Sequence, residues 1–311
     1  MLSNLSNEIR DSRDIFYTTI RREERDGIIT KIRHRQLEKL KISQDLPPTQ
    51  DDPTSTSHQD FENSPEYDKV LETRQNFITA FQKKDLDGML TAIKFFRRRI
   101  DTSEADYSIV KEFLNTGLVP YFVEILGYSD DCLSKLIEQI ISIISNCCGG
   151  PDAPIPSLKE HGIFEIFVKL LEVTQNIEHL DSILRGLANI AGSSYENSQH
   201  LMDLEICAKI NDKMTQVVFG QMKSKFDLEK TIPVLHAFLW VVSNLSGCDR
   251  KGTYEKCKIF VPICRRVLEM SQDDDCIRES LWVVHFLTKN NPYEICELLQ
   301  DKLCYDRIVK L

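Results

Sequence analysis

The 311-residue chain is longer than one small globular core, and it carries 48 acidic against 39 basic residues. Its net charge of −9 excludes a chain built as a whole to coat nucleic acid. Only 12 glycines and 11 prolines are present, too few for a β architecture with a turn every 8–12 residues. The composition therefore favours helices.

The ten cysteines do not have the pattern of a disulfide framework or a zinc site. The first ten residues are polar and lack the apolar core of a secretory signal, and no Cys-x-x-Cys spacing occurs. Several cysteines lie in apolar runs, where a free thiol packs as a small hydrophobe. No apolar run reaches the roughly 18 residues that span a bilayer. We therefore expect a reduced intracellular protein with no cofactor, no metal, no membrane contact and no direct nucleic-acid contact.

The chain starts with a basic arm, residues 1–44. Residues 10–41 hold ten basic and six acidic residues, so this stretch carries +4 and the rest of the chain −13. Apolar residues recur at helical spacing in 28–40, which indicates a basic amphipathic helix; the alternative is a solvated, frayed helix. Residues 45–67 contain four prolines among Ser, Thr, Asp and Gln and no apolar period. This second segment is expected to be a disordered acidic linker.

After the linker, apolar residues recur at steps of three and four, and longer stretches repeat. The segment 118–126 aligns with 163–171 at an offset of 45 residues, and 260–268 has the same pattern, with Pro262 matching Pro120. Each segment forms a helix too short to bury its own apolar face. The repetition therefore predicts that helices stack on helices.

A second motif follows each complete copy of the first. It places Asn146, Asn189, Asn244 and Phe286 at equivalent positions, with spacings of 43, 55 and 42 residues. A period of about 42 residues with two or three helices is typical of armadillo repeats. We predict an all-α armadillo-repeat, right-handed superhelical solenoid over residues 68–311, with about five repeats and the start of a sixth. Because Leu311 falls inside a repeat helix, we expect either that the chain is a fragment or that its last apolar face is exposed or covered by something else.

The last helix of each armadillo unit is expected to line an inner groove. Trp240 and Asn244 share one helix face, as do Trp282 and Phe286, and these are the chain's two tryptophans. Indole faces attract Lys and Arg side chains, and an Asn amide can donate to and accept from the backbone of an extended peptide. The alternative is that both tryptophans are large core residues and that Asn244 ends a helix.

The basic arm, the acidic linker and the motifs at 187–192, 239–245 and 280–288 resemble importin-α, the adaptor that carries cargo with nuclear localisation signals. The resemblance implies that the groove binds Lys- and Arg-rich signals, that the arm binds importin-β, and that the protein shuttles between cytoplasm and nucleus. The cargo-binding residues that it implies are Trp240, Asn244, Trp282, Phe286, Asn189, Asn146, Asp275 and Glu279. The arm residues that it implies are Arg21, Arg22, Arg25, Lys31, Arg33, Arg35, Lys39 and Lys41.

The sequence also departs from the importin-α pattern. Arg185 and Ser142 stand where two repeats would carry Trp, and Ser193 replaces an acid that would hold a lysine. An Arg in a cation-binding groove repels the ligand. The alternative function is a non-transport armadillo scaffold or chaperone that has lost general signal recognition. No motif of nucleotide, metal or nucleophilic catalysis is present, so we do not expect an enzyme.

Overall fold

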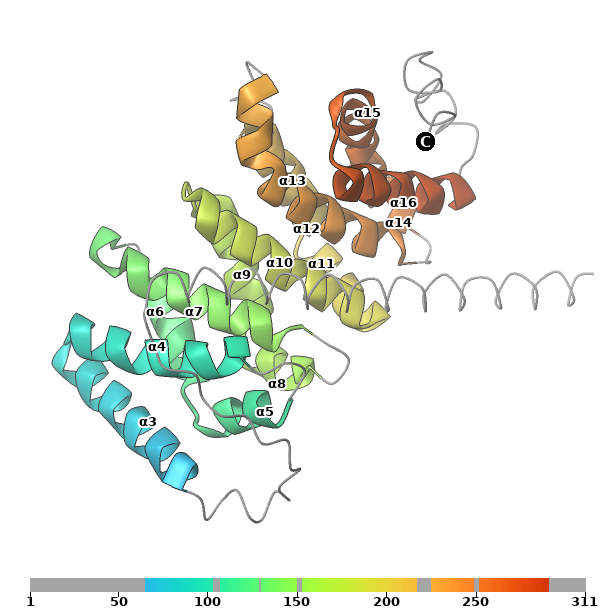
Figure 1. The fold of residues 1–311 in the computed structure, drawn as a ribbon. Helices are drawn as coiled ribbons and strands as arrows, with labels where there is room; N and C mark the ends of the chain where they lie inside the picture. Colours follow the sequence, from blue (N-terminus) through green and yellow to red (C-terminus); the bar gives the residue numbers. More distant parts are fainter. Residues whose placement is uncertain are drawn as a thin grey trace, which may run out of the picture.

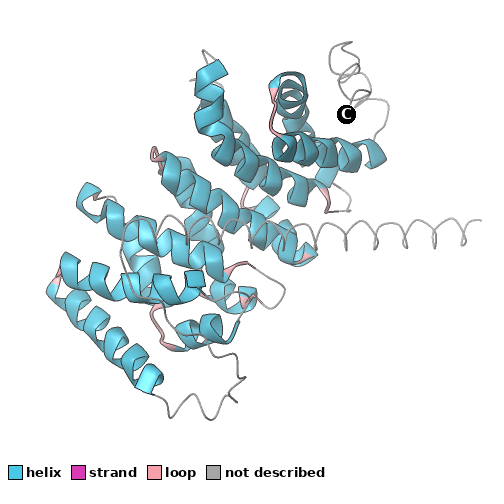
Figure 2. Cartoon of the chain, in the orientation of Figure 1, coloured by secondary structure: helices cyan, strands magenta, loops and turns pink. Residues whose placement is uncertain are grey.

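The structure is a computed structural model, and it describes residues 65–102, 107–128, 130–149, 153–216, 225–248 and 252–290. Every element in these ranges is a helix (Figure 2), as the composition and the apolar period predicted. No helix among them is long and apolar enough to cross a membrane. The basic arm, most of the linker and the expected sixth repeat lie outside the described residues.

The helices fall into five consecutive units (Figure 1). The first unit consists of α3 (Pro65–Lys83) and α4 (Leu86–Thr102). The second consists of α5 (Tyr107–Asn115), α6 (Val119–Leu126), η1 (Asp131–Leu133) and α7 (Ser134–Cys147). The third consists of α8 (Ile155–Glu160), α9 (Ile163–Val173) and α10 (Ile177–Ser193).

The fourth unit consists of α11 (Tyr195–Asp203), α12 (Ile206–Met214) and α13 (Lys225–Ser246). The fifth consists of α14 (Thr253–Cys257), η3 (Lys258–Phe260), α15 (Val261–Met270) and α16 (Asp274–Asn290). The first unit begins at Pro65, three residues before the predicted boundary. The 55-residue spacing is explained in part by α13, which at 22 residues is longer than α10 or α16.

The last helix of each unit packs against the last helix of the next, from α4 through α7, α10 and α13 to α16 (Figure 1). We call these five the ladder helices. The three copies of the first motif form α6, α9 and α15, and the matching prolines lie in the first turns of α6 and α15, where a missing N–H costs no helical hydrogen bond. The corresponding helix of the fourth unit, α12, had no recognisable motif.

One apolar core runs through all five units. Leu136, Ile140 and Ile144 on α7 are fully buried, as their three- and four-residue spacing predicted. Gly186 of α10 lies in close contact with α9 of the same unit. A Cβ atom there would lie 2.4 Å from Cε2 of Phe167 on α9, so only glycine fits without a shift of the ring.

Candidate functional site

Three asparagines mark equivalent positions on successive ladder helices. Nδ2 of Asn146 donates to Oδ1 of Asp101 at 2.6 Å, and Nδ2 of Asn189 donates to the carbonyl oxygen of Ser145 at 3.2 Å. Nδ2 of Asn244 donates to the carbonyl oxygen of Ala188 at 2.8 Å. Each amide therefore bonds to the preceding ladder helix. The three asparagines that align in the sequence thus make equivalent contacts in the structure. These bonds fix how one unit sits on the next, at about 0.5–1.5 kcal/mol each.

Asn189 and Asn244 differ in exposure. Asn189 is 7% exposed, and its buried Oδ1 has no hydrogen-bond partner. Asn244 is half-buried. Each amide uses a donor to hold two ladder helices together. That they bind a peptide backbone stays a prediction.

The two tryptophans occupy matching positions but differ in exposure. Trp240, on α13 between α10 and α16, is only 3% exposed and lies against His236 with ring centroids 6.4 Å apart. Trp282, on α16, is half-buried and stacks on Phe286 at 5.6 Å with an interplanar angle of 21°. Trp240 therefore mainly packs the ladder, as the core alternative describes, while Trp282 and Phe286 present an aromatic surface.

The two predicted acids also differ. Asp275 is exposed and accepts a hydrogen bond at 2.7 Å from Arg278, one turn along α16. Glu279 is 4% exposed, and its Oε2 accepts from Oγ of Ser243 on α13 at 2.5 Å. Glu279 thus joins two ladder helices, and Asp275 carries the accessible charge.

His236 lies among these charged groups, and the sequence had given it no role. Burial lowers its pKa; Glu279, Asp275 and Asp273 oppose that shift, and Arg185 adds to it. Its Nε2 has no hydrogen-bond partner. The imidazole is therefore mostly neutral at pH 7 and adds no positive charge beside these acids.

Arg185, expected to repel a basic ligand, forms an ion pair within its own helix. Its Nε lies 2.8 Å from Oδ2 of Asp181, one turn earlier on α10. Nη1 of Arg185 and Oδ1 of Asp181 have no hydrogen-bond partners. The four-residue spacing could have revealed this pair, which reduces the repulsion expected from Arg185 alone. Ser142, at the same position on α7, is buried and supplies no aromatic surface.

The structure brings Trp240, Asn244, Asp275, Glu279, Trp282 and Phe286 together on the packed pair α13 and α16. Asn146 and Asn189 lie at the equivalent positions of α7 and α10, and each donates to the preceding ladder helix. The eight predicted arm residues, Arg21, Arg22, Arg25, Lys31, Arg33, Arg35, Lys39 and Lys41, lie outside the described residues. Among the described residues, no group of three or more His, Cys, Asp or Glu could hold a metal ion.

The solved structures that this chain resembles include designed armadillo repeat proteins. One, a designed armadillo repeat protein in complex with the peptide (KR)4, matches with a TM-score of 0.57 and 15% identity over 77% of this chain and 96% of the other. A computationally designed armadillo repeat protein for modular peptide recognition matches with a TM-score of 0.61 and 15% identity, over 78% and 91%. A third designed armadillo protein matches with a TM-score of 0.56 and 14% identity, over 76% and 96%.

No protein-family model matches the chain, and no curated protein is significantly similar to it. The likeness to solved structures establishes the fold. The equivalent contacts of Asn146, Asn189 and Asn244 between successive units agree with a repeat fold. The chain is an all-helical repeat protein of the armadillo type.

Proposed function

We propose that the surface of the ladder helices α13 and α16 that carries Asp275, Trp282 and Phe286, the ladder face, binds an extended, Lys- and Arg-rich peptide. We further propose that the protein is a nuclear import adaptor. The observation that carries the proposal is the partly exposed aromatic pair Trp282 and Phe286, on the helix that also carries exposed Asp275. A Lys or Arg side chain can lay its aliphatic stem on the indole and reach the carboxylate with its charge.

The local charge balance supports a cationic ligand. The first two turns of α16 and the residue before it contain Asp273, Asp274, Asp275 and Glu279, against the single cation Arg278. His236 adds no positive charge at pH 7, because burial lowers its pKa. A designed protein of the same fold forms a complex with the peptide (KR)4. That peptide has the Lys- and Arg-rich composition that we propose for the ligand.

Fluorescence anisotropy with a labelled octapeptide of alternating Lys and Arg tests the proposal. An uncharged Gln-Ser octapeptide is the ligand control. Trp282→Ala and Asp275→Asn should each weaken binding about 3- to 30-fold, the equivalent of roughly 0.5–2 kcal/mol per cation contact. Asp212→Asn makes the same charge change on α12, which is not a ladder helix, and should leave the affinity unchanged.

Absence of binding by the full chain, and by a chain lacking residues 1–64, would contradict the proposal. Binding that appears only in the shortened chain would show instead that the arm competes for the ladder face. Binding that is equally weakened by Asp212→Asn would reduce the result to nonspecific attraction by a −9 protein.

The second part of the proposal is that the arm recruits importin-β and that the protein shuttles between cytoplasm and nucleus. It rests on the +4 charge of residues 10–41 and on the importin-α resemblance. A pull-down of importin-β by the full chain at about 0.1 M salt tests it. At that ionic strength exposed charges more than roughly 10 Å apart are screened, so recovery reflects close charge contacts. The joint change Arg33→Ala and Arg35→Ala should lower the recovery.

A non-transport scaffold or chaperone remains the alternative function. The observation that favours it lies in the middle of the ladder, where Ser142 is buried and Arg185 is paired with Asp181. These two units offer no indole to a long signal. A scaffold would fail to bind the Lys-Arg octapeptide with or without its arm, so the same titration separates the two functions.

A further inference from the structure

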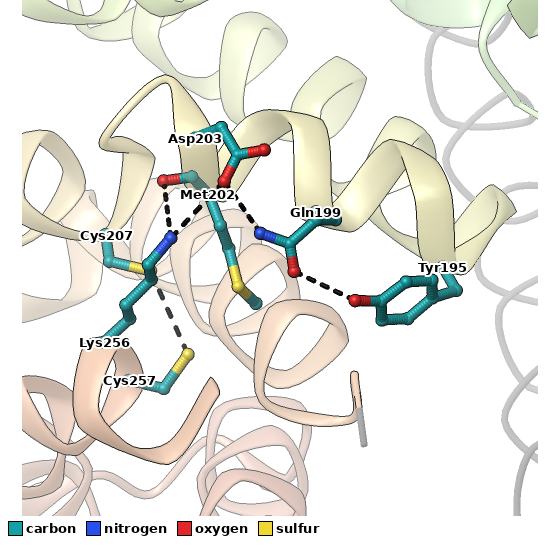
Figure 3. Close-up of polar contacts among 7 residues, drawn as sticks. All are labelled: Tyr195, Gln199, Met202, Asp203, Cys207, Lys256 and Cys257. Atoms are coloured by element: carbon teal, nitrogen blue, oxygen red, sulfur yellow. Dashed lines mark hydrogen bonds and ion pairs between the residues drawn. The ribbon is translucent and has the colours of Figure 1, made fainter. Parts of the chain in front are cut away.

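Two cysteines from different units lie close together (Figure 3). Sγ of Cys207, the second residue of α12, lies 3.9 Å from Sγ of Cys257, the last residue of α14. The two residues are 50 positions apart in the sequence, and both side chains are buried. A disulfide requires about 2.05 Å between the sulfurs. A closure of roughly 2 Å by side-chain rotation and a small helix shift would therefore join them.

The two thiols differ in acidity, which gives each a separate role. The pKa of Cys207 is lowered, first by the hydrogen bond between the two thiols and further because Lys256 is nearby, although burial opposes the shift. The same hydrogen bond, together with burial, raises the pKa of Cys257 well above its ordinary value. Since the thiolate is the reactive form, Cys207 is the nucleophile and Cys257 the second thiol.

A set of polar contacts holds the lysine in place (Figure 3). Nζ of Lys256 donates to the carbonyl oxygen of Met202 at 3.3 Å and lies 3.6 Å from Oδ1 of Asp203. Nε2 of Gln199 donates to that same carboxylate oxygen at 2.8 Å, and Gln199 in turn accepts from the hydroxyl of Tyr195 at 3.0 Å. These contacts fix α11 against α14 and keep the ammonium group near Cys207.

We propose that Cys207 and Cys257 form a modification site, at which a hydroperoxide oxidises the two thiols to a disulfide that links the fourth and fifth units. The Cys207 thiolate attacks one peroxide oxygen, the O–O bond breaks, and hydroxide leaves, so the sulfur becomes a sulfenic acid. The sulfur of Cys257 then attacks that of Cys207, and the S–O bond breaks. The departing hydroxide takes the thiol proton. In sum, two thiols and one hydrogen peroxide give one disulfide and two waters.

Access to the site is limited but present. Cys207 is 5% exposed, whereas Cys257 is fully buried, so Cys207 is the more accessible of the two residues to a small oxidant. The resulting crosslink would tie α12 to α14, helices of the two units that carry Trp240 and Trp282. The inference does not depend on the proposed peptide binding, because it uses none of the residues that we propose to contact the peptide.

Peptide mapping of the full chain tests the proposal. The protein is treated with hydrogen peroxide, alkylated with iodoacetamide and digested with a protease that cleaves after Glu. Cys207 then lies in residues 206–229 as the one cysteine, and Cys257 lies in residues 256–269 together with Cys264. We expect a linked pair of these peptides that is two hydrogen atoms lighter than their sum and separates on reduction.

Three variants assign the sulfurs. Cys264→Ser should leave the linked pair intact, because burial raises the pKa of the Cys264 thiol to about 12 and makes it a poor nucleophile. Cys257→Ser should abolish the link and allow dimedone to label a sulfenic acid at Cys207, whereas Cys207→Ser should give no label at Cys257. Recovery of Cys207 and Cys257 as alkylated thiols from oxidised wild-type protein would overturn the proposal. So would a linked pair that disappears in Cys264→Ser.

Discussion

Asn244→Ala separates the structural role of the ladder asparagines from any role in binding. The substitution removes one amide hydrogen bond of 2.8 Å to the carbonyl oxygen of Ala188. That carbonyl lies within α10, so helical hydrogen bonding keeps it from being left unpaired, and the cost should be about 1 kcal/mol. Asn244→Asp should cost more, about 2 kcal/mol or above, because it sets a carboxylate against a carbonyl oxygen.

Asn189→Ala should cost less than Asn244→Ala. Its bond to the carbonyl oxygen of Ser145 is longer, at 3.2 Å, and its buried Oδ1 has no partner. Removing the side chain therefore removes an unfavourable buried acceptor together with a weak bond, and the net change should be under about 0.5 kcal/mol. Asn115→Ala, at the exposed end of α5, is the control and should fall within about ±0.5 kcal/mol.

The assay is urea unfolding followed by circular dichroism, with the slope of each transition compared with wild type. The expected order of destabilisation is Asn244→Asp, then Asn244→Ala, then Asn189→Ala. A cost for Asn189→Ala equal to or above that of Asn244→Ala would refute the reasoning from the unpartnered oxygen. Loss of peptide binding in an Asn244 variant is informative only if the folded fraction is measured in the same sample.

Three further predictions follow from the geometry. Gly186→Ala should lower the free energy of unfolding by about 1–3 kcal/mol, because its Cβ would lie 2.4 Å from the Phe167 ring; Phe167→Leu should recover part of this loss in a double-mutant cycle. Burial lowers the folded-state pKa of His236, so stability should fall as the pH drops below about 6.5, where the unfolded chain takes up the proton. The same titration of His236→Phe should show a smaller fall, and an equal fall would contradict this origin. Arg185→Ala should strengthen binding of the Lys-Arg octapeptide, since it leaves Asp181 unpaired; unchanged or weaker binding in the anisotropy assay would show that Arg185 is outside the ligand's reach.

The sequence by itself determined the helical class, the period of about 42 residues and the alignment of Asn146, Asn189 and Asn244. These features depend on apolar spacing within one helix and on repetition along the chain, and both are visible in a single sequence. The predicted first-motif helices were found at α6, α9 and α15. The α12 helix was missed because residues 206–214 carry no recognisable copy of the first motif.

Only the tertiary structure decided what each aligned residue does. Trp240 is buried and Trp282 half-buried although they stand at the same repeat position, and Trp240 lies on α13, which packs against both α10 and α16. The contact of Glu279 with Ser243 and that between Cys207 and Cys257 cross unit boundaries. Such contacts depend on how one unit is rotated on the next, and the period of a sequence carries no information about that rotation.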